Sequence, residues 1–113
     1  EEALDNELPA CPMTSAGSLP NGLKYFVRTC RKPKGRAALR LAVKVGSLEE
    51  EDDQLGLAHF LEHACFLGTT SFGKGDLIKY MESIGASFGA DLNAHTSFSE
   101  TVYKLSIPIE GEA

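Results

Sequence analysis

Residues 55–67 read LGLAHFLEHACFL, and this apolar stretch decides the fold of the chain. It is too long for a typical strand and contains no proline, so it predicts a helix. A helix that is apolar almost all round is normally buried, and we expect the same of this one. It nevertheless carries two histidines and a glutamate, in the string His59-Phe60-Leu61-Glu62-His63.

The three ionisable side chains of this string fall on one face of the predicted helix. At about 100° per residue, His59, Glu62 and His63 lie within about a third of the circumference. Burying three such groups is costly unless a partner compensates, and a metal cation is the simplest partner. Two imidazoles one turn apart can both bind Zn²⁺, and the glutamate can act as general base on a zinc-bound water. The alternative is a pair of ordinary half-buried histidines, one of them paired with Glu62.

Periodicity elsewhere predicts two strands before this helix, and a second helix and two more strands after it. The earlier strands span residues 23–29 and 37–46, and the later ones span 88–95 and 103–109. The second helix has Asp76 as its N-cap and ends at Gly85. The order β-β-α-α-β-β predicts an α+β fold, with the helices packed on one face of a mainly antiparallel sheet.

The first residues of the chain show no such pattern. Residues 1–18 contain two prolines and several small polar residues without periodicity. We therefore expect a loosely ordered leader over residues 1–18, followed by a domain over residues 19–113.

Basic residues are concentrated in one part of an acidic chain. The 113 residues carry 11 Lys and Arg against 16 Asp and Glu, a net charge of −5, yet eight of the basic residues fall between Lys24 and Lys44. Apolar residues alternate with Arg40 and Lys44 in the strand at 37–46, so that strand has an apolar face and a solvated basic face. We prefer this interpretation to a nucleic-acid site and expect no nucleic-acid partner. The acidic run at 49–53 is interpreted as a solvated loop that favours the dipole of the following helix.

Cysteine usage and hydropathy indicate a soluble protein in a reducing compartment, such as the cytosol or an organelle matrix or stroma. The three cysteines, Cys11, Cys30 and Cys65, are widely spaced and odd in number, which indicates neither a disulfide framework nor a thiolate zinc cluster. Cys65 points about 160° away from His63 on the helix, so we interpret it as a buried apolar thiol. No apolar run approaches the ~18 residues of a membrane span.

The motif and its surroundings resemble one family of peptidases. The segments GLAHFLEH at 56–63 and FLGT at 66–69 are similar to the core motif, H-x-x-E-H, of the pitrilysin/insulinase family of zinc metallopeptidases. Further matches follow in order along the chain, at LPNGL (19–23), VGS (45–47), GA (85–86), NAHT (93–96) and TVY (101–103).

The resemblance implies a zinc metalloendopeptidase that hydrolyses extended peptides. His59 and His63 match the zinc ligands of the family, and Glu62 matches its catalytic base. Asn93 and Ala94 match the strand that lies beside the bound substrate and pairs with it through the main chain. From the pattern alone, Asn93 and His95 are equally well explained as solvent-facing strand residues.

The chain departs from the family pattern in the third zinc ligand. In the family this ligand is a glutamate that lies farther along than the 50 residues that follow His63 here. We therefore expect the chain to be the N-terminal part of a longer peptidase, partnered by the rest of that protein or by a homologous second half, and to be inactive by itself. The alternative is a catalytically silent peptide-binding or scaffold subunit of the same fold, although such subunits usually lose the motif that is intact here.

Overall fold

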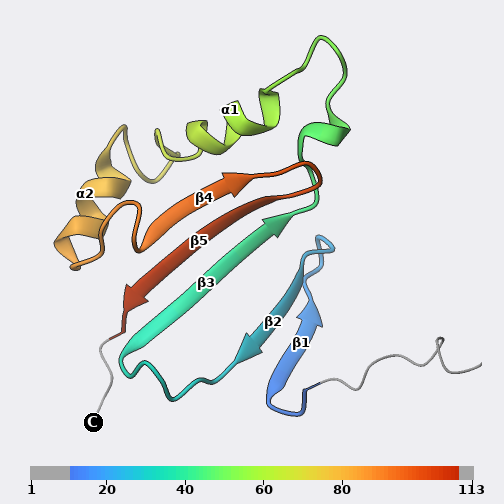
Figure 1. Ribbon diagram of the computed structural model, residues 1–113. Coiled ribbons are helices and arrows are strands. Elements are labelled where there is room, and N and C mark those ends of the chain that lie inside the picture. Colours follow the sequence, from blue (N-terminus) through green and yellow to red (C-terminus); the bar gives the residue numbers. More distant parts are fainter. Residues whose placement is uncertain (1–10, 110–113) are drawn as a thin grey trace, which may run out of the picture. The chain divides into compact units, whose positions relative to one another are not determined.

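The computed structural model describes residues 11–109, which divide into two compact units between Lys34 and Gly35. The first unit is an antiparallel hairpin of β1 (Thr14–Ser18) and β2 (Lys24–Arg28), shown in Figure 1. Gly22 in the turn has φ of +86°, in the left-handed region that favours glycine. The strand predicted at 23–29 is confirmed as β2.

Strand β1 corrects the prediction of a loosely ordered leader for the last residues of that segment. Thr14–Ser18 pairs along β2, from Thr14 opposite Arg28 to Ser18 opposite Lys24. Its sequence, TSAGS, has no apolar alternation, so pairing with β2 makes it a strand and its own pattern does not. Residues 1–10 of the predicted leader lie outside the described residues.

The second unit contains a three-stranded antiparallel sheet in the order β3-β5-β4 (Figure 1). Along the chain its elements are β3 (Arg36–Val43), the short 3-10 helix η1 (Ser47–Glu49), α1 (Leu57–Ala64), α2 (Asp76–Ser83), β4 (Leu92–Thr96) and β5 (Thr101–Pro108). The expected α+β class and antiparallel pairing are confirmed.

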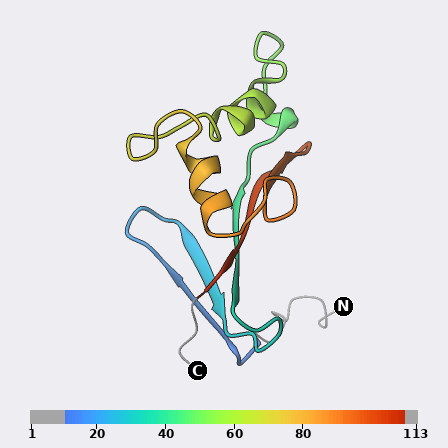
Figure 2. The same cartoon turned by 90° about the vertical axis from the view of Figure 1, so that its left-hand side faces the viewer.

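Both helices lie on the same side of this sheet, as Figure 2 shows with the sheet nearly edge-on. The core on that side is small, and its buried apolar residues are Met81 of α2, Ala86 after α2, and Leu92 of β4. Partly buried apolar residues pack against it from α1's C-terminal end, α2 and β5, namely Phe66, Leu77, Ile84, Leu105 and Ile107. The prediction that the helices share one face of the sheet is confirmed.

The cross-strand register confirms the two faces predicted for the strand at 37–46. Leu41 of β3 lies opposite Tyr103 of β5, and Arg40 lies opposite Lys104, on the other face. Leu39 and Leu41 nevertheless keep 48% and 47% of their surface exposed, so the helices cover only part of the apolar face.

Predictions for three of the helices and strands need correction. Helix α1 is shorter than the predicted stretch and is not buried: Phe60 and Leu61 are 67% and 59% exposed, and Glu62 is its only buried residue. The strand predicted from Phe88 begins only at Leu92, because the chain turns before that point. Helix α2 begins with Asp76 as its first residue and not as its N-cap, and Gly85 follows its end with φ of +77°, as predicted.

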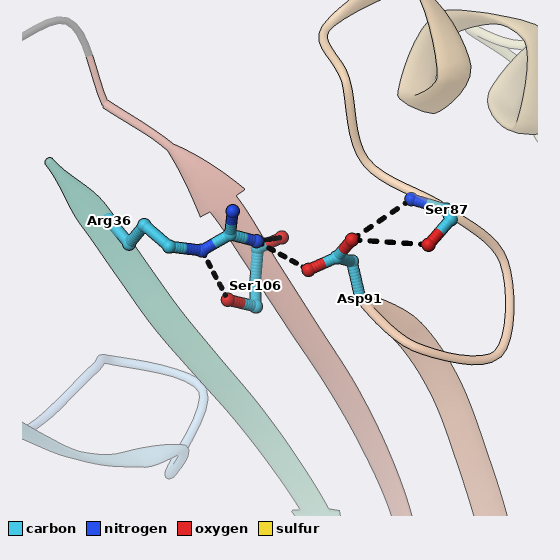
Figure 3. Close-up of polar contacts among 4 residues, drawn as sticks. All are labelled: Arg36, Ser87, Asp91 and Ser106. Atoms are coloured by element: carbon cyan, nitrogen blue, oxygen red, sulfur yellow. Dashed lines mark hydrogen bonds and ion pairs between the residues drawn. The ribbon is translucent and has the colours of Figure 1, made fainter. Parts of the chain in front are cut away.

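An ionic cluster fixes the turn that leads into β4 (Figure 3). Arg36 at the start of β3 forms an ion pair with Asp91 and donates from Nε to Ser106 Oγ of β5 at 3.3 Å. The second carboxylate oxygen of Asp91 accepts from the backbone N–H of Ser87 at 3.0 Å. That N–H bond, with Arg36 as a smaller cause, lowers the pKa of Asp91. The cluster therefore ties together β3, β5 and the residue that precedes β4.

Candidate metal and peptide site

A glutamate of the acidic run fixes where α1 begins. The two carboxylate oxygens of Glu50 accept from the backbone N–H groups of Gly56 and Ala58, each at 2.8 Å. These bonds occupy backbone groups that have no partner inside the helix, and they lower the pKa of Glu50. The predicted favourable charge at this helix end is thus a direct contact, which places His59 in the first turn of α1.

The two histidines of the motif face each other on the exposed side of α1. His59 Nε2 and His63 Nε2 lie 3.0 Å apart, and the ring centroids are separated by 4.7 Å. A Zn–N bond of about 2.0–2.1 Å allows two nitrogens bound to one ion to be up to about 4 Å apart, so this separation fits two zinc ligands. In residues 11–109 no third His, Cys, Asp or Glu joins them in a group that could hold a metal.

Glu62 lies between the histidines in sequence but has a different environment. It is only 7% exposed, while both histidines are exposed. The Thr96 hydroxyl at the end of β4 donates to Glu62 Oε2 at 2.6 Å. His59 and Thr96 also line one open pocket of about 360 Å³, whose other lining residues are Ser47, Glu50, Gly56, Ser97 and Phe98. The structure therefore places Glu62 and His59 next to the end of β4, with His63 against His59.

Strand β4 lies at one edge of the three-stranded sheet. The backbone N–H of Ser97 donates to Glu100 O at 2.8 Å, and this bond fixes which residues of β4 direct their backbone groups toward β5. Because backbone groups alternate between facing the partner strand and facing away from it, Leu92, Ala94 and Thr96 turn theirs to the open edge.

Only the last part of this edge is available to another strand. The turn before β4 already bonds both backbone groups of Leu92. The Ala94 N–H donates to the side chain of its neighbour, Asn93 Oδ1, at 2.9 Å. Within the described chain, an extended peptide could therefore pair with the Ala94 carbonyl and with the backbone groups of Thr96, the residue bonded to Glu62.

Cys65 differs from the prediction of a buried thiol. Its side chain is exposed, and Sγ lies 3.4 Å from the Tyr103 hydroxyl. Burial, and then the contact with Cys65, raise the pKa of Tyr103 to about 12. Neither group reaches the two histidine nitrogens through a hydrogen bond among the described residues.

The sequence reasoning missed two residues of this site, Thr96 and Glu50. Thr96 lies in the segment NAHT, which the resemblance includes. The alternating pattern of this strand does not indicate that Thr96 would bond to Glu62, a residue 34 positions away. Glu50 was one of five acidic residues with no feature that set it apart. None of the helices in residues 11–109 has both the length and the apolar composition that a membrane span requires.

Sequence comparison places these features among peptidases. The chain matches the insulinase family, peptidase family M16, over residues 26–111. It is 50% identical over 110 residues to the zinc protease PQQL-like of Arabidopsis thaliana, and 45% identical over 101 residues to the probable zinc protease PqqL of Escherichia coli K12. It is also 37% identical over 108 residues to the chloroplastic stromal processing peptidase of Pisum sativum.

Structural comparison agrees with the sequence comparison. The crystal structure of the first half of the periplasmic protease PqqL from Escherichia coli superposes with a TM-score of 0.86 at 43% identity, covering 93% of this chain and 22% of that one. The sequence match to the Arabidopsis relative covers 97% of this chain and 11% of that protein. The corresponding shares are 89% and 11% for PqqL of Escherichia coli K12, and 96% and 8% for the Pisum peptidase. It thus spans about a tenth of the length of these relatives. Motif, fold and relatives lead to one conclusion: the chain belongs to the insulinase family of peptidases, peptidase family M16.

Proposed function

We propose that this chain forms part of the active site of a zinc metalloendopeptidase that cleaves extended peptides. The observation that carries the proposal is the environment of Glu62, a buried carboxylate held by Thr96 on the same helix as two histidines whose Nε2 atoms lie 3.0 Å apart. A buried acid next to two exposed imidazoles on one helix fits a base beside a metal better than it fits a solvated helix face. The names of the relatives, zinc proteases and processing peptidases, support the same chemistry.

Each residue of the motif has a distinct role in this proposal. His59 and His63 would hold the zinc ion, which supplies Lewis-acid chemistry by polarising the scissile carbonyl and making water more acidic. Glu62 accepts the proton of the attacking water and later delivers it to the leaving amine, as a general base and acid. A further ligand and the opposite wall of the site would come from another part of the same protein or from a homologous second half.

The peptide would bind along the open edge of β4. Backbone groups of Ala94 and Thr96 point to that edge, and pairing there would place an extended substrate next to Glu62. The Asn93 side chain must release the Ala94 N–H for this pairing, so Asn93 would tune access to the edge. Selection would then depend on an extended backbone, which favours unfolded peptides.

The test uses the whole polypeptide that carries this sequence, loaded with zinc, and a quenched fluorogenic peptide library. We expect Glu62→Gln to keep its zinc and to lose cleavage by about 10²- to 10⁴-fold, because general acid–base catalysis contributes about that much. Glu82→Gln, at an exposed acid of α2, is the matched control and should retain activity. His59→Ala should lose zinc and activity together, while His95→Ala, at an exposed histidine of β4, should keep both.

A catalytically silent peptide-binding subunit is the second candidate. It is favoured by the finding that residues 11–109 assemble two metal-binding side chains and not three. Peptide binding that survives both His59→Ala and Glu62→Gln, with no cleavage by the unmodified protein, would establish this candidate and refute the peptidase.

A further inference from the structure

The buried carboxylate of Glu62 has one specific partner. The apolar side chains of Phe60 and Leu61 in helix α1 are mostly exposed, and Glu62 is the buried residue of this helix. The Thr96 hydroxyl is the group that bonds this carboxylate among the described residues, at 2.6 Å from Oε2. The angle at which Glu62 enters the site therefore depends on a contact with the end of β4.

The protons of this contact can be counted. A threonine hydroxyl has one proton to donate. Thr101 on β5 gives its proton to the Val45 carbonyl, 2.9 Å away. The Thr96 hydroxyl donates to Glu62 Oε2 at 2.6 Å, while Thr101 Oγ1, whose proton goes to the shorter contact with Val45, lies 3.4 Å from Thr96 Oγ1. Thr96 is thus a donor to Oε2, and its one proton is used there.

This arrangement leaves the two oxygens of Glu62 with different tasks. Oε2 is occupied by the Thr96 proton, while Oε1 has no hydrogen bond from residues 11–109. A base must be within hydrogen-bond reach of the proton that it abstracts, so fixing one oxygen fixes the direction of the other. Thr96 is also the last residue of β4, so the residue that bonds Glu62 belongs to the edge strand along which a peptide would lie.

We propose that Thr96 is a positioning residue, whose hydroxyl holds Glu62 Oε2 so that Oε1 is directed at the attacking water. This inference rests on the proposed peptidase function and adds to it a residue outside the H-x-x-E-H motif. Thr96 does not touch substrate through its side chain and does not ligate the metal. Its effect is on the rate of the chemical step and not on zinc or peptide affinity.

The test compares Thr96→Val with Thr96→Ser in the zinc-loaded whole polypeptide. Valine keeps the shape and the strand propensity of threonine but has no hydroxyl, whereas serine restores the hydroxyl. We expect Thr96→Val to lower kcat by about 10- to 100-fold, the range expected for a misplacement of about 1 Å. KM and zinc affinity, the latter measured by competition with a chelating dye, should stay within about 2-fold, and Thr96→Ser should recover most of kcat.

Two further measurements separate positioning from a general loss of structure. Thr101→Val removes a buried hydroxyl of the same hairpin that does not reach Glu62, so it should lower Tm but reduce kcat less than Thr96→Val does. The carboxylate ¹³C NMR signal of Glu62 should move in Thr96→Val and return in Thr96→Ser, a readout that needs no activity.

The outcomes distinguish this inference from the function on which it rests. If Glu62→Gln retains cleavage, or the zinc-loaded protein cleaves nothing, the peptidase proposal fails and the positioning role with it. If Glu62→Gln is inactive but Thr96→Val keeps full kcat, loses zinc, or is not rescued by serine, the peptidase stands and the positioning role is refuted.

Discussion

The backbone between β3 and η1 passes so close to the β4–β5 turn that Gly46→Ala should destabilise the second unit and disturb the site. Gly46 is buried, and a Cβ added there would lie 2.3 Å from Ser97 O and 2.5 Å from Phe98 O. Both atoms belong to backbone and cannot rotate away. The φ of Gly46, −146°, is open to alanine, so the cost comes from the contact and not from backbone strain.

The magnitude follows from the hydrogen bonds that the methyl group would break. Ser47 N donates to Ser97 O at 3.1 Å, and Leu48 N donates to Phe98 O at 2.9 Å, so these carbonyls cannot retreat without losing them. Each such bond contributes about 0.5–1.5 kcal/mol net, so their loss costs about 1–3 kcal/mol. The shift also moves residue 96, which precedes the turn, and should weaken the contact of Thr96 with Glu62.

Gly73→Ala is the matched control for this prediction. A Cβ at Gly73 would meet Asp76 Oδ2 at 2.8 Å, the end of an exposed side chain that can swing aside, and Gly73 is also outside the positive-φ region. Both substitutions reduce the entropy of the unfolded chain equally, so their difference isolates the contact. Urea unfolding followed by circular dichroism should show a smaller free energy of unfolding for Gly46→Ala than for Gly73→Ala. Equal stabilities within about 0.5 kcal/mol would refute the argument.

Three other perturbations have defined outcomes. Because its pKa is lowered, Glu50 should stabilise α1 above pH 4.5, its ordinary value, and lose this effect as the pH falls; thermal melts of Glu50→Gln should lack that acid-side loss. The pKa of Tyr103 is raised from 10.0 to about 12, so its contribution to the stability of the fold should be complete below pH 10 and be lost as the pH rises through 12. An ultraviolet titration should show a tyrosinate signal that appears near pH 12 and is absent from Tyr103→Phe. Met81→Ala should cost about 2–5 kcal/mol in urea unfolding, and no measurable cost would show that the small core does not support the unit.

The sequence predicted the parts of this protein that depend on local geometry. The spacing of His59, Glu62 and His63 places them on one side of a helix whatever the rest of the chain does, because the rotation per residue is fixed. The alternation around Arg40 likewise assigned two faces to β3, and Gly85 marked the end of α2. The resemblance to the insulinase family rested on the same local strings.

Local patterns failed where a partner distant in sequence decides the outcome. Phe88 continued an apolar alternation, but the Arg36 cluster bends the residues before Leu92 into a turn. The segment TSAGS became β1 because β2 lies beside it. Helix α1 was expected to be buried because of its apolar sides, yet the described residues do not supply enough surface to cover it.

The sequence by itself determined the helix with its two histidines and glutamate, the faces of the strands and the family, since each depends on neighbours along the chain. Only the tertiary structure decided that β4 is an edge strand, that its open groups lie at Ala94 and Thr96, and that Thr96 holds Glu62. Residues 62 and 96 are brought together by the pairing of β4 with β5 and the packing of α1 on the sheet. Such contacts depend on the free energy of the whole fold, so the periodicity of the sequence does not predict them.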